Sequence, residues 1–293
     1  VYYLTVDVAA LDGKEHNVAL YFDASAQHAV NTEEQQVQWK TWSSDSDFDG
    51  VQLGNAEQNV LGSKGDRVNI DWGFLHLARP AGDAAATALW AGSATSARTT
   101  FEQGGSLPTA TDARQPRAAS DDLPVLATAH NFSFSSARAT HTIMLAYDDV
   151  KSVYYFGDEY KALWTRNYTD IQHAIAAAYA EHDVMLAKSE AYDAALVAAL
   201  AAKAGPKYAA LTALAYRQTL AATKLVWNDK RQLIWNFLKE ISTNGDMQTM
   251  DVIYPGSPML LYTNPELLKL LLVPVLAYAH NETFIQFSNP YSP

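Results

Sequence analysis

The sequence contains no cysteine among its 293 residues. This absence excludes disulfide bridges, thiolate metal sites and a cysteine nucleophile, and it fits either redox compartment. Basic residues are outnumbered, with 21 Lys and Arg against 32 Asp and Glu, so the net charge is −11. Nucleic acids and anionic membranes both require clustered basic side chains, so neither is an expected partner. The chain has no uncharged apolar run of about 18 residues, so no membrane-spanning helix is expected.

Length and hydrophobic content predict two domains with packed cores. A chain of 293 residues exceeds one ordinary core, and 48% of its residues are hydrophobic. There is no initial Met and no signal peptide, and the opening "VYYLTVDVAAL" already has a strand pattern. We therefore expect a processed or trimmed product.

Residues 1–150 predict an antiparallel β-sandwich. Segments such as "YYLTVDVAAL", "HNVALYFDAS" and "NIDWGFLHLA" are rich in β-branched and aromatic residues and are separated by turn residues. Asp12-Gly13 carries the signal of a tight turn between the first two strands. Short strands with regular turns are typical of a sandwich.

Residues 151–293 predict helices. Fourteen of the 34 residues in 171–204 are alanine, and no Gly or Pro interrupts them. A second helix is expected to begin after Gly205-Pro206 and to continue through 227. A third begins at Asn264 as N-cap, with proline at its first position. Alanine-rich helices in this order favour a stack of helical hairpins.

The stretch "FLKEISTNGDMQTMDVIYPGSP", residues 237–258, is expected to form a polar loop between two helices, closed by its two prolines. If the preceding helix reaches Ser242, then Lys239 and Ser242 share a face, which permits a Ser-Lys nucleophile arrangement. Glu240 and Asp251 could instead work as general acid and base. The alternative is structural, since carboxylates beside a turn also act as caps or as solvated charges.

Four further residues are candidates for substrate binding. Asn244 and the backbone N–H of Gly245 lie at the bend of this loop, where they could meet an oxyanion. Arg217 offers a planar fork suited to a carboxylate. Gln218 is expected on the apolar stripe of its helix, where it either pairs with a backbone group or lines a pocket.

Two other patterns have ordinary interpretations. The segment 43–50, "SSDSDFDG", opens like a calcium loop, but Ala56 stands where the twelfth-position glutamate is expected, which favours a plain turn. The histidines show no metal-ligand spacing, so no metal site is expected; those considered are His130, His141 and His173. Three sequons are candidate glycosylation sites: Asn131, Asn167 and Asn281.

Several long segments resemble the secreted glutaminase A family of fungi and its bacterial relatives. They include "LYFDASAQHAVN", "YDDVKSVYYFGDEYKALWTRNY", "YRQTLAATKLVW" and "KEISTNGDMQTMDVIYPGSPMLLYTNPELLK", and the resemblance covers nearly the whole chain. It implies a β-sandwich followed by an (α/α)6 toroid, an extracellular or cell-wall location, and action on L-glutamine, in some members also on L-asparagine. It also implies that the chain is the middle of a longer polypeptide.

We therefore predict an α+β multidomain hydrolase of linear amide bonds, a glutaminase or glutaminase-asparaginase that needs no cofactor. Residues 1–150 form the sandwich domain, and 151–293 form the first half of the toroid. A separate or missing C-terminal polypeptide of the same precursor completes the toroid, which makes the particle a proteolytically processed heterodimeric glycoprotein. The alternatives are a glycoside hydrolase built on the same kind of toroid and a non-catalytic carbohydrate-binding subunit.

Overall fold

The structure is a computed structural model that describes residues 1–62, 68–84, 86–134, 138–239 and 247–280. The chain divides into two compact units. Unit 1 contains residues 1–63, 69–150 and 168–182, and unit 2 contains residues 64–68, 151–167 and 183–293. Antiparallel sheets and a helical hairpin confirm the mixed α and β content that the sequence predicts.

The larger sheet of unit 1 has the strand order β1-β9-β5-β4-β3-β7 in the described residues. Its strands are β1 (Tyr2–Ala9), β3 (Gln36–Ser43), β4 (Phe48–Asn55), β5 (Phe74–Pro80), β7 (Arg117–Ala118) and β9 (Arg138–Asp148). Because β1 pairs with β9 and not with β2, the Asp12-Gly13 turn joins two sheets and closes no hairpin.

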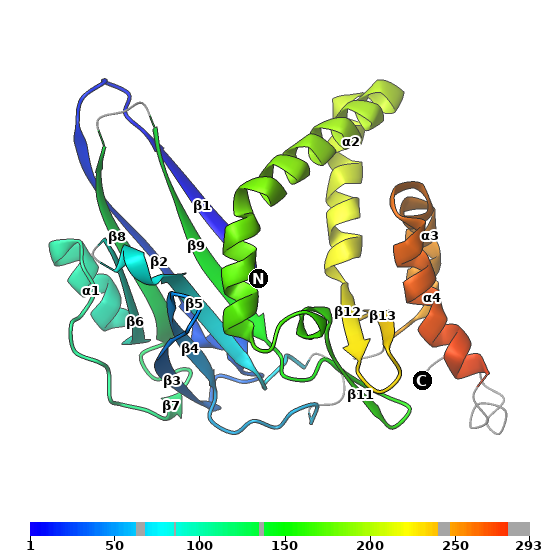
Figure 1. The fold of residues 1–293 in the computed structure, drawn as a ribbon, viewed down its shortest axis with the longest axis horizontal. Coiled ribbons are helices and arrows are strands. Elements are labelled where there is room, and N and C mark those ends of the chain that lie inside the picture. The colour runs from blue at the N-terminus through cyan, green and yellow to red at the C-terminus, as the bar shows by residue number, and fades with distance from the viewer. Residues whose placement is uncertain (63–67, 85, 135–137, 240–246, 281–293) are drawn as a thin grey trace. The chain divides into compact units, whose positions relative to one another are not determined.

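The smaller sheet of unit 1 has the order β2-β8-β6, visible in Figure 1. It contains β2 (His16–Ser25), β6 (Thr87–Ser93) and β8 (Pro124–Phe134), and the helices nearby are η1 (Ala26–Ala29), η2 (Ala81–Asp83) and α1 (Ala94–Gly104). One core takes side chains from both sheets, including Leu53 and Leu77 from the larger and Leu126 from the smaller. Alternation of apolar residues along these strands produces this shared core.

Helix α2 (Ile171–Ala221) begins in unit 1 and ends in unit 2. It consists of two helical segments, because Ala204 and Gly205 have non-helical backbone angles and Gly205 has φ +83°. A left-handed backbone favours glycine, and Pro206 has no N–H to bond to the preceding turn. The predicted restart after Gly205-Pro206 is therefore confirmed.

Unit 2 contains a sheet that the sequence did not predict, with the order β10-β11-β12-β13. Its strands are β10 (Val153–Tyr155), β11 (Asp158–Ala162), β12 (Thr223–Asn228) and β13 (Leu233–Leu238), and η3 (Leu163–Arg166) follows β11. The prediction of helix through residue 227 is wrong, because helix α2 ends at Ala221 and β12 follows. Val226 and Trp227 are buried and pair with β13, so strand pairing outweighs the helical pattern of a short apolar run.

Helices α3 (Met250–Thr263) and α4 (Pro265–Ala279) form a hairpin joined at Asn264. The Asn264 side chain accepts a hydrogen bond from the Leu267 N–H at 3.3 Å, which confirms the predicted N-cap. Figure 1 shows both helices beside β12 and β13. Leu260 of α3 and Leu271 of α4 are buried in one cluster with Leu238 of β13. No helix in the described part of the chain is long and apolar enough to cross a membrane.

The prolines expected to close the polar loop lie instead inside α3, at Pro255 and Pro258. Proline normally disfavours a helix interior because it lacks an N–H and crowds the preceding turn. Here the buried side chains of Ile253 and Leu260 hold the helix against its neighbours. Tertiary packing therefore overrides the local signal.

Candidate functional site

The elements that carry the predicted site residues meet in unit 2. The N–H of Lys239, which follows β13, donates to the carbonyl of Ala222 at the end of α2, with a distance of 2.9 Å. Helix α3 passes close to the same helix, since a Cβ added to Gly256 would lie 3.3 Å from Cγ2 of Thr219. Leu220 of α2 packs into the cluster that α3, α4 and β13 share.

Gln248 is the residue that fixes this meeting point. Its side chain is 3% exposed, and its Oε1 accepts from the Leu238 N–H at 2.6 Å. Its Nε2 donates to the carbonyl of Leu271 at 2.9 Å and, more weakly, to that of Asn236 at 3.4 Å. One buried amide therefore joins β13, the start of α3 and α4. These hydrogen bonds also fix the position of the chain just before α3 begins.

The predicted residues of the described part lie at the rim of this meeting point. Lys239 forms a β-bridge with Met247, so it extends the strand β13 and is not part of a helix. Arg217 and Gln218 are exposed in the last part of α2. Gln218 therefore does not lie on a buried stripe. The other loop candidates lie outside the described residues: Glu240, Ser242, Asn244 and Gly245.

Asp251 lies in the first turn of α3, and its side chain is exposed. A carboxylate is stabilised there by the positive end of the helix dipole. Because Pro255 has no N–H, it cannot donate to the carbonyl of Asp251 as an ordinary residue of a helix would. Asp251 therefore combines an accessible carboxylate with a backbone acceptor outside the helical ladder, and both can bind polar groups of a substrate.

Thr249 is a further candidate residue that the sequence reasoning missed. It is the N-cap of α3, yet its Oγ1 is buried and has no hydrogen-bond partner within the described residues. A buried hydroxyl left unsatisfied is unfavourable by about 1–3 kcal/mol, which makes it a place for a polar ligand or water. A threonine directly before a helical segment is a recognisable N-cap signal, and it could have been read from the sequence.

A cavity of about 280 Å³ opens on the sheet of unit 2. Lys161 and Asp229 form an ion pair across it at 3.7 Å, and Trp227 lies in its wall beneath the guanidinium of Arg166. Its lining thus carries both signs of charge and an aromatic face. Such a surface suits a small zwitterion better than a purely anionic ligand.

Unit 1 contains a larger cavity of about 380 Å³, and neither Lys239 nor Asp251 lines it. Its lining includes Gln38, Lys40, Gln52 and Phe74. Among the described residues, this lining contains no carboxylate, imidazole or hydroxyl side chain, so it offers no general base for activating water.

The acidic segment 43–50 forms the turn between β3 and β4, and its carboxylates face different partners. Asp49 accepts a hydrogen bond from Ser43 at 2.7 Å and pairs with Arg79 at 3.4 Å. Asp45 lies 3.3 Å from Nε2 of His173.

Among the sequons, Asn131 and Asn167 are exposed, whereas Asn281 lies outside the described residues.

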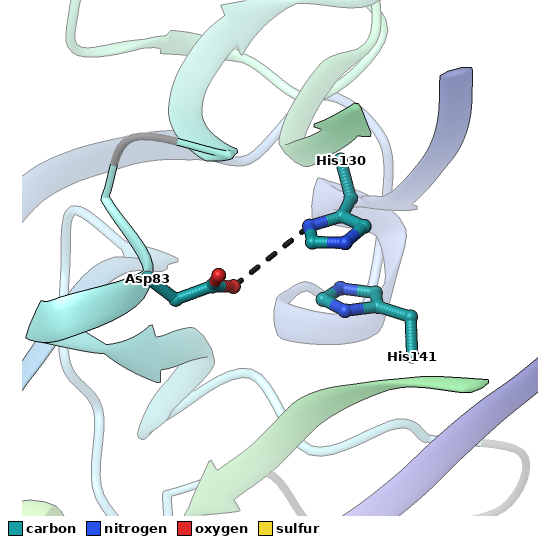
Figure 2. Close-up of side chains that lie close together, drawn as sticks. All are labelled: Asp83, His130 and His141. Carbon is teal, nitrogen blue, oxygen red and sulfur yellow. Dashed lines mark ion pairs between the residues drawn. The ribbon is translucent and has the colours of Figure 1, made fainter. Parts of the chain in front are cut away.

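The structure brings together two histidines that the sequence did not connect. The rings of His130 and His141 are stacked, with centroids 3.6 Å apart, and Asp83 lies beside His130 (Figure 2). Burial lowers the pKa of His141 to about 4, with a further contribution from His130, and burial also lowers the pKa of His130. His130 precedes residue 135 by five positions and His141 follows residue 137 by four. Their proximity in the sequence, on either side of the connection from β8 to β9, was the available signal.

Fold and site together define a protein with an antiparallel β unit followed by a helical-hairpin unit that carries the candidate residues. The Glutaminase A six helical-hairpin domain matches residues 205–293, and a domain of unknown function, DUF5127, matches residues 1–199. The boundary between the two matches falls at the break in α2. Every described candidate of the predicted active site therefore lies in the hairpin match.

Glutaminase A of Aspergillus oryzae is 31% identical over 287 residues, which cover 95% of this chain and 40% of that protein. A probable glutaminase of Arthroderma benhamiae is 30% identical over 235 residues, covering 76% of this chain and 26% of that protein. The chain belongs to the glutaminase A family, as its sequence segments indicated. It spans less than half the length of these two relatives.

Proposed function

We propose that the protein is part of an amidohydrolase that converts L-glutamine to L-glutamate and ammonia, with L-asparagine as a second substrate. The observation that carries this proposal is the family membership, because the match to the hairpin domain spans all the candidate residues of unit 2. The names of both relatives support it. The mixed-charge cavity of unit 2 is consistent with a free amino acid as the ligand.

Deamidation needs a group that activates an attacking oxygen, donors for the developing oxyanion, and a proton for the departing ammonia. In this proposal Glu240 or Asp251 is the base, and Asn244 with the N–H of Gly245 stabilises the oxyanion. Arg217 holds the α-carboxylate of the substrate. The exposed position of Asp251 at the start of α3 supports its role.

We further propose the complete architecture as a β-sandwich followed by the first part of an (α/α)6 toroid, which a C-terminal polypeptide of the same precursor completes. Large apolar side chains are exposed along the helices of unit 2, which supports a covering partner. They include Leu211 and Leu214 of α2, Leu261 and Tyr262 of α3, and Leu276 of α4.

Secretion with N-glycosylation is part of the same proposal. Asn131 and Asn167 are exposed, and Asn167 stands at the end of η3 outside any strand, so it is the favoured glycan site. Because both side chains are exposed, an oligosaccharide can be attached to either without disturbing a hydrophobic core. An exposed asparagine in a sequon is the form that the glycosylation machinery accepts.

Side-by-side assays of the protein purified from its native source test the activity. The proposal predicts release of ammonia from L-glutamine and no release of reducing sugar from oligosaccharides. Sugar release without ammonia would replace it by the glycoside hydrolase alternative.

A further inference from the structure

We propose that Asp83, His130 and His141 form a binding site for one divalent transition-metal cation, with Zn²⁺ as the best-matched ion. These residues come from three elements of unit 1: Asp83 from η2, His130 from β8 and His141 from β9. Their potential ligand atoms all lie within 4.8 Å of one another. Imidazole nitrogens with one carboxylate oxygen are a donor set typical of zinc.

The three side chains already lie close together, as Figure 2 shows. Nδ1 of His130 lies 3.8 Å from Oδ2 of Asp83, and the rings of His130 and His141 meet at an angle of 11°. Ligands on one tetrahedral zinc lie about 3.4 Å apart, so closing the cluster takes a movement of about 1 Å. Because lone pairs lie in the ring planes, parallel rings cannot both point at one ion, and binding has to tilt His141 out of the stack.

Asp83 and His130 are already oriented by a shared partner, Thr87. The Thr87 hydroxyl donates to Oδ2 of Asp83, and its oxygen lies 2.5 Å from Nδ1 of His130. A hydroxyl has one proton, so with that proton given to Asp83 the Thr87 oxygen accepts from the Nδ1–H of His130. This tautomer leaves the lone pair of Nε2 of His130 for the metal, so Nε2 is the ligand atom and the 3.8 Å between Nδ1 and Asp83 describes the free site and is not a ligand–ligand distance. A hydrogen bond to the second ring nitrogen is the usual support of a metal-ligating histidine.

The three residues lie where the two sheets of unit 1 come close, so a bound metal would act on the contact between the sheets. His130 belongs to the smaller sheet and His141 to the larger, and both lie near the point where the chain crosses between them. A cation held by both would therefore cross-link the two sheets of unit 1. All three ligand residues are partly exposed, so ions can enter and a water molecule can complete the coordination.

Calorimetric titration of the complete chain with ZnCl₂, after removal of metal with a chelator, tests the site. We expect one ion per chain and a rise in the melting temperature with zinc concentration, since the ion binds the folded state. His141→Gln and Asp83→Asn should each weaken binding at least tenfold. The matched control is His173→Gln, which removes a histidine that also contacts two aspartates, at 2.8 and 3.3 Å, but belongs to no cluster of potential metal ligands within the described residues.

Thr87→Val should weaken zinc binding by about 10- to 100-fold, the usual effect of removing a group that orients a metal ligand, and Thr87→Ser should restore it. Substituting Co²⁺ gives a readout that does not depend on the stability of any variant. Wild-type protein should show the intense visible absorption of four-coordinate cobalt. Three results would overturn the site: no stoichiometric binding by wild type, binding by His141→Gln as tight as wild type, or a weak six-coordinate cobalt spectrum.

Discussion

Gln248 shows how one side chain can determine local architecture. Its amide satisfies the Leu238 N–H and the Leu271 carbonyl, both in the buried interior of unit 2. Removing it leaves the Leu238 N–H without this partner, removes one of the hydrogen bonds that the Leu271 carbonyl accepts, and opens a cavity, and an unsatisfied buried group costs about 1–3 kcal/mol. Gln248→Ala should therefore lower the free energy of unfolding by about 2–4 kcal/mol, measured by urea denaturation.

Gln232→Ala is the matched control for this change. Gln232 has a similar left-handed backbone, with φ 52° against 60° for Gln248, but its side chain is exposed. The backbone contribution should therefore be the same in both variants. Equal losses in the two would show that backbone strain, and not the buried amide, explains the effect.

His76 should make stability fall in acid. It is 2% exposed, neither ring nitrogen has a hydrogen-bond partner in the described part of the chain, and burial, with Lys40, lowers its pKa to about 4. The folded state thus favours the neutral ring. The contribution of the neutral His76 ring to the free energy of unfolding is complete above the unfolded pKa of about 6.5. It is lost as the pH falls toward 4, by about 3 kcal/mol in total.

Unfolding curves of wild type and His76→Leu between pH 7 and pH 4 measure this contribution. The wild type should lose about 3 kcal/mol more than the variant, because leucine does not titrate. His28→Gln, at an exposed position, should keep the wild-type pH dependence. Parallel curves for wild type and His76→Leu would contradict the assignment.

At the scale of elements, the break in α2 depends on one glycine. Gly205 has φ +83°, and a Cβ added there would meet no atom within 4 Å, so backbone strain is the sole penalty. Gly205→Ala should lower stability by about 1–2 kcal/mol, measured by thermal or urea unfolding. Gly82→Ala also adds a Cβ in open space but without a positive φ, so it should be neutral or slightly stabilising. A neutral Gly205→Ala would show that the break can adopt another geometry.

The elements also show which parts of the fold can be predicted from sequence. Local signals suffice where the chain itself supplies the partner: Asn264 caps α4 through its own side chain, and Gly205-Pro206 interrupts α2 by backbone geometry. Local signals fail where pairing or packing with a distant segment determines the secondary structure. Thr223–Asn228 follows a helix directly and becomes a strand because β13 and β11 pair with it. The prolines of α3 are tolerated for the same kind of reason.

At the scale of the molecule, membership of the glutaminase A family followed from long segments, whereas the individual site residues did not. The sequence drew its candidates from α2, β13 and α3, and these elements contact one another in unit 2. A local signal could identify Thr249 as an N-cap, but the sequence could not show that its hydroxyl and the Gln248 side chain are buried, because elements far away in the chain bury them. The sequence also did not connect His130 with His141, which belong to different sheets of unit 1 and come together only in the folded chain.

The catalytic role of the β13–α3 segment is the central claim, and amide substitutions of its carboxylates test it most directly. The measurement is kcat/KM for L-glutamine in Glu240→Gln and Asp251→Asn, expressed in the native host. The control is Glu266→Gln, an exposed carboxylate of α4 that pairs with Lys269 at 3.0 Å. We predict a loss of about 100-fold or more in at least one test variant, the contribution expected of a general base, and none in the control. Normal turnover in both test variants, with intact folding by circular dichroism, would contradict the claim.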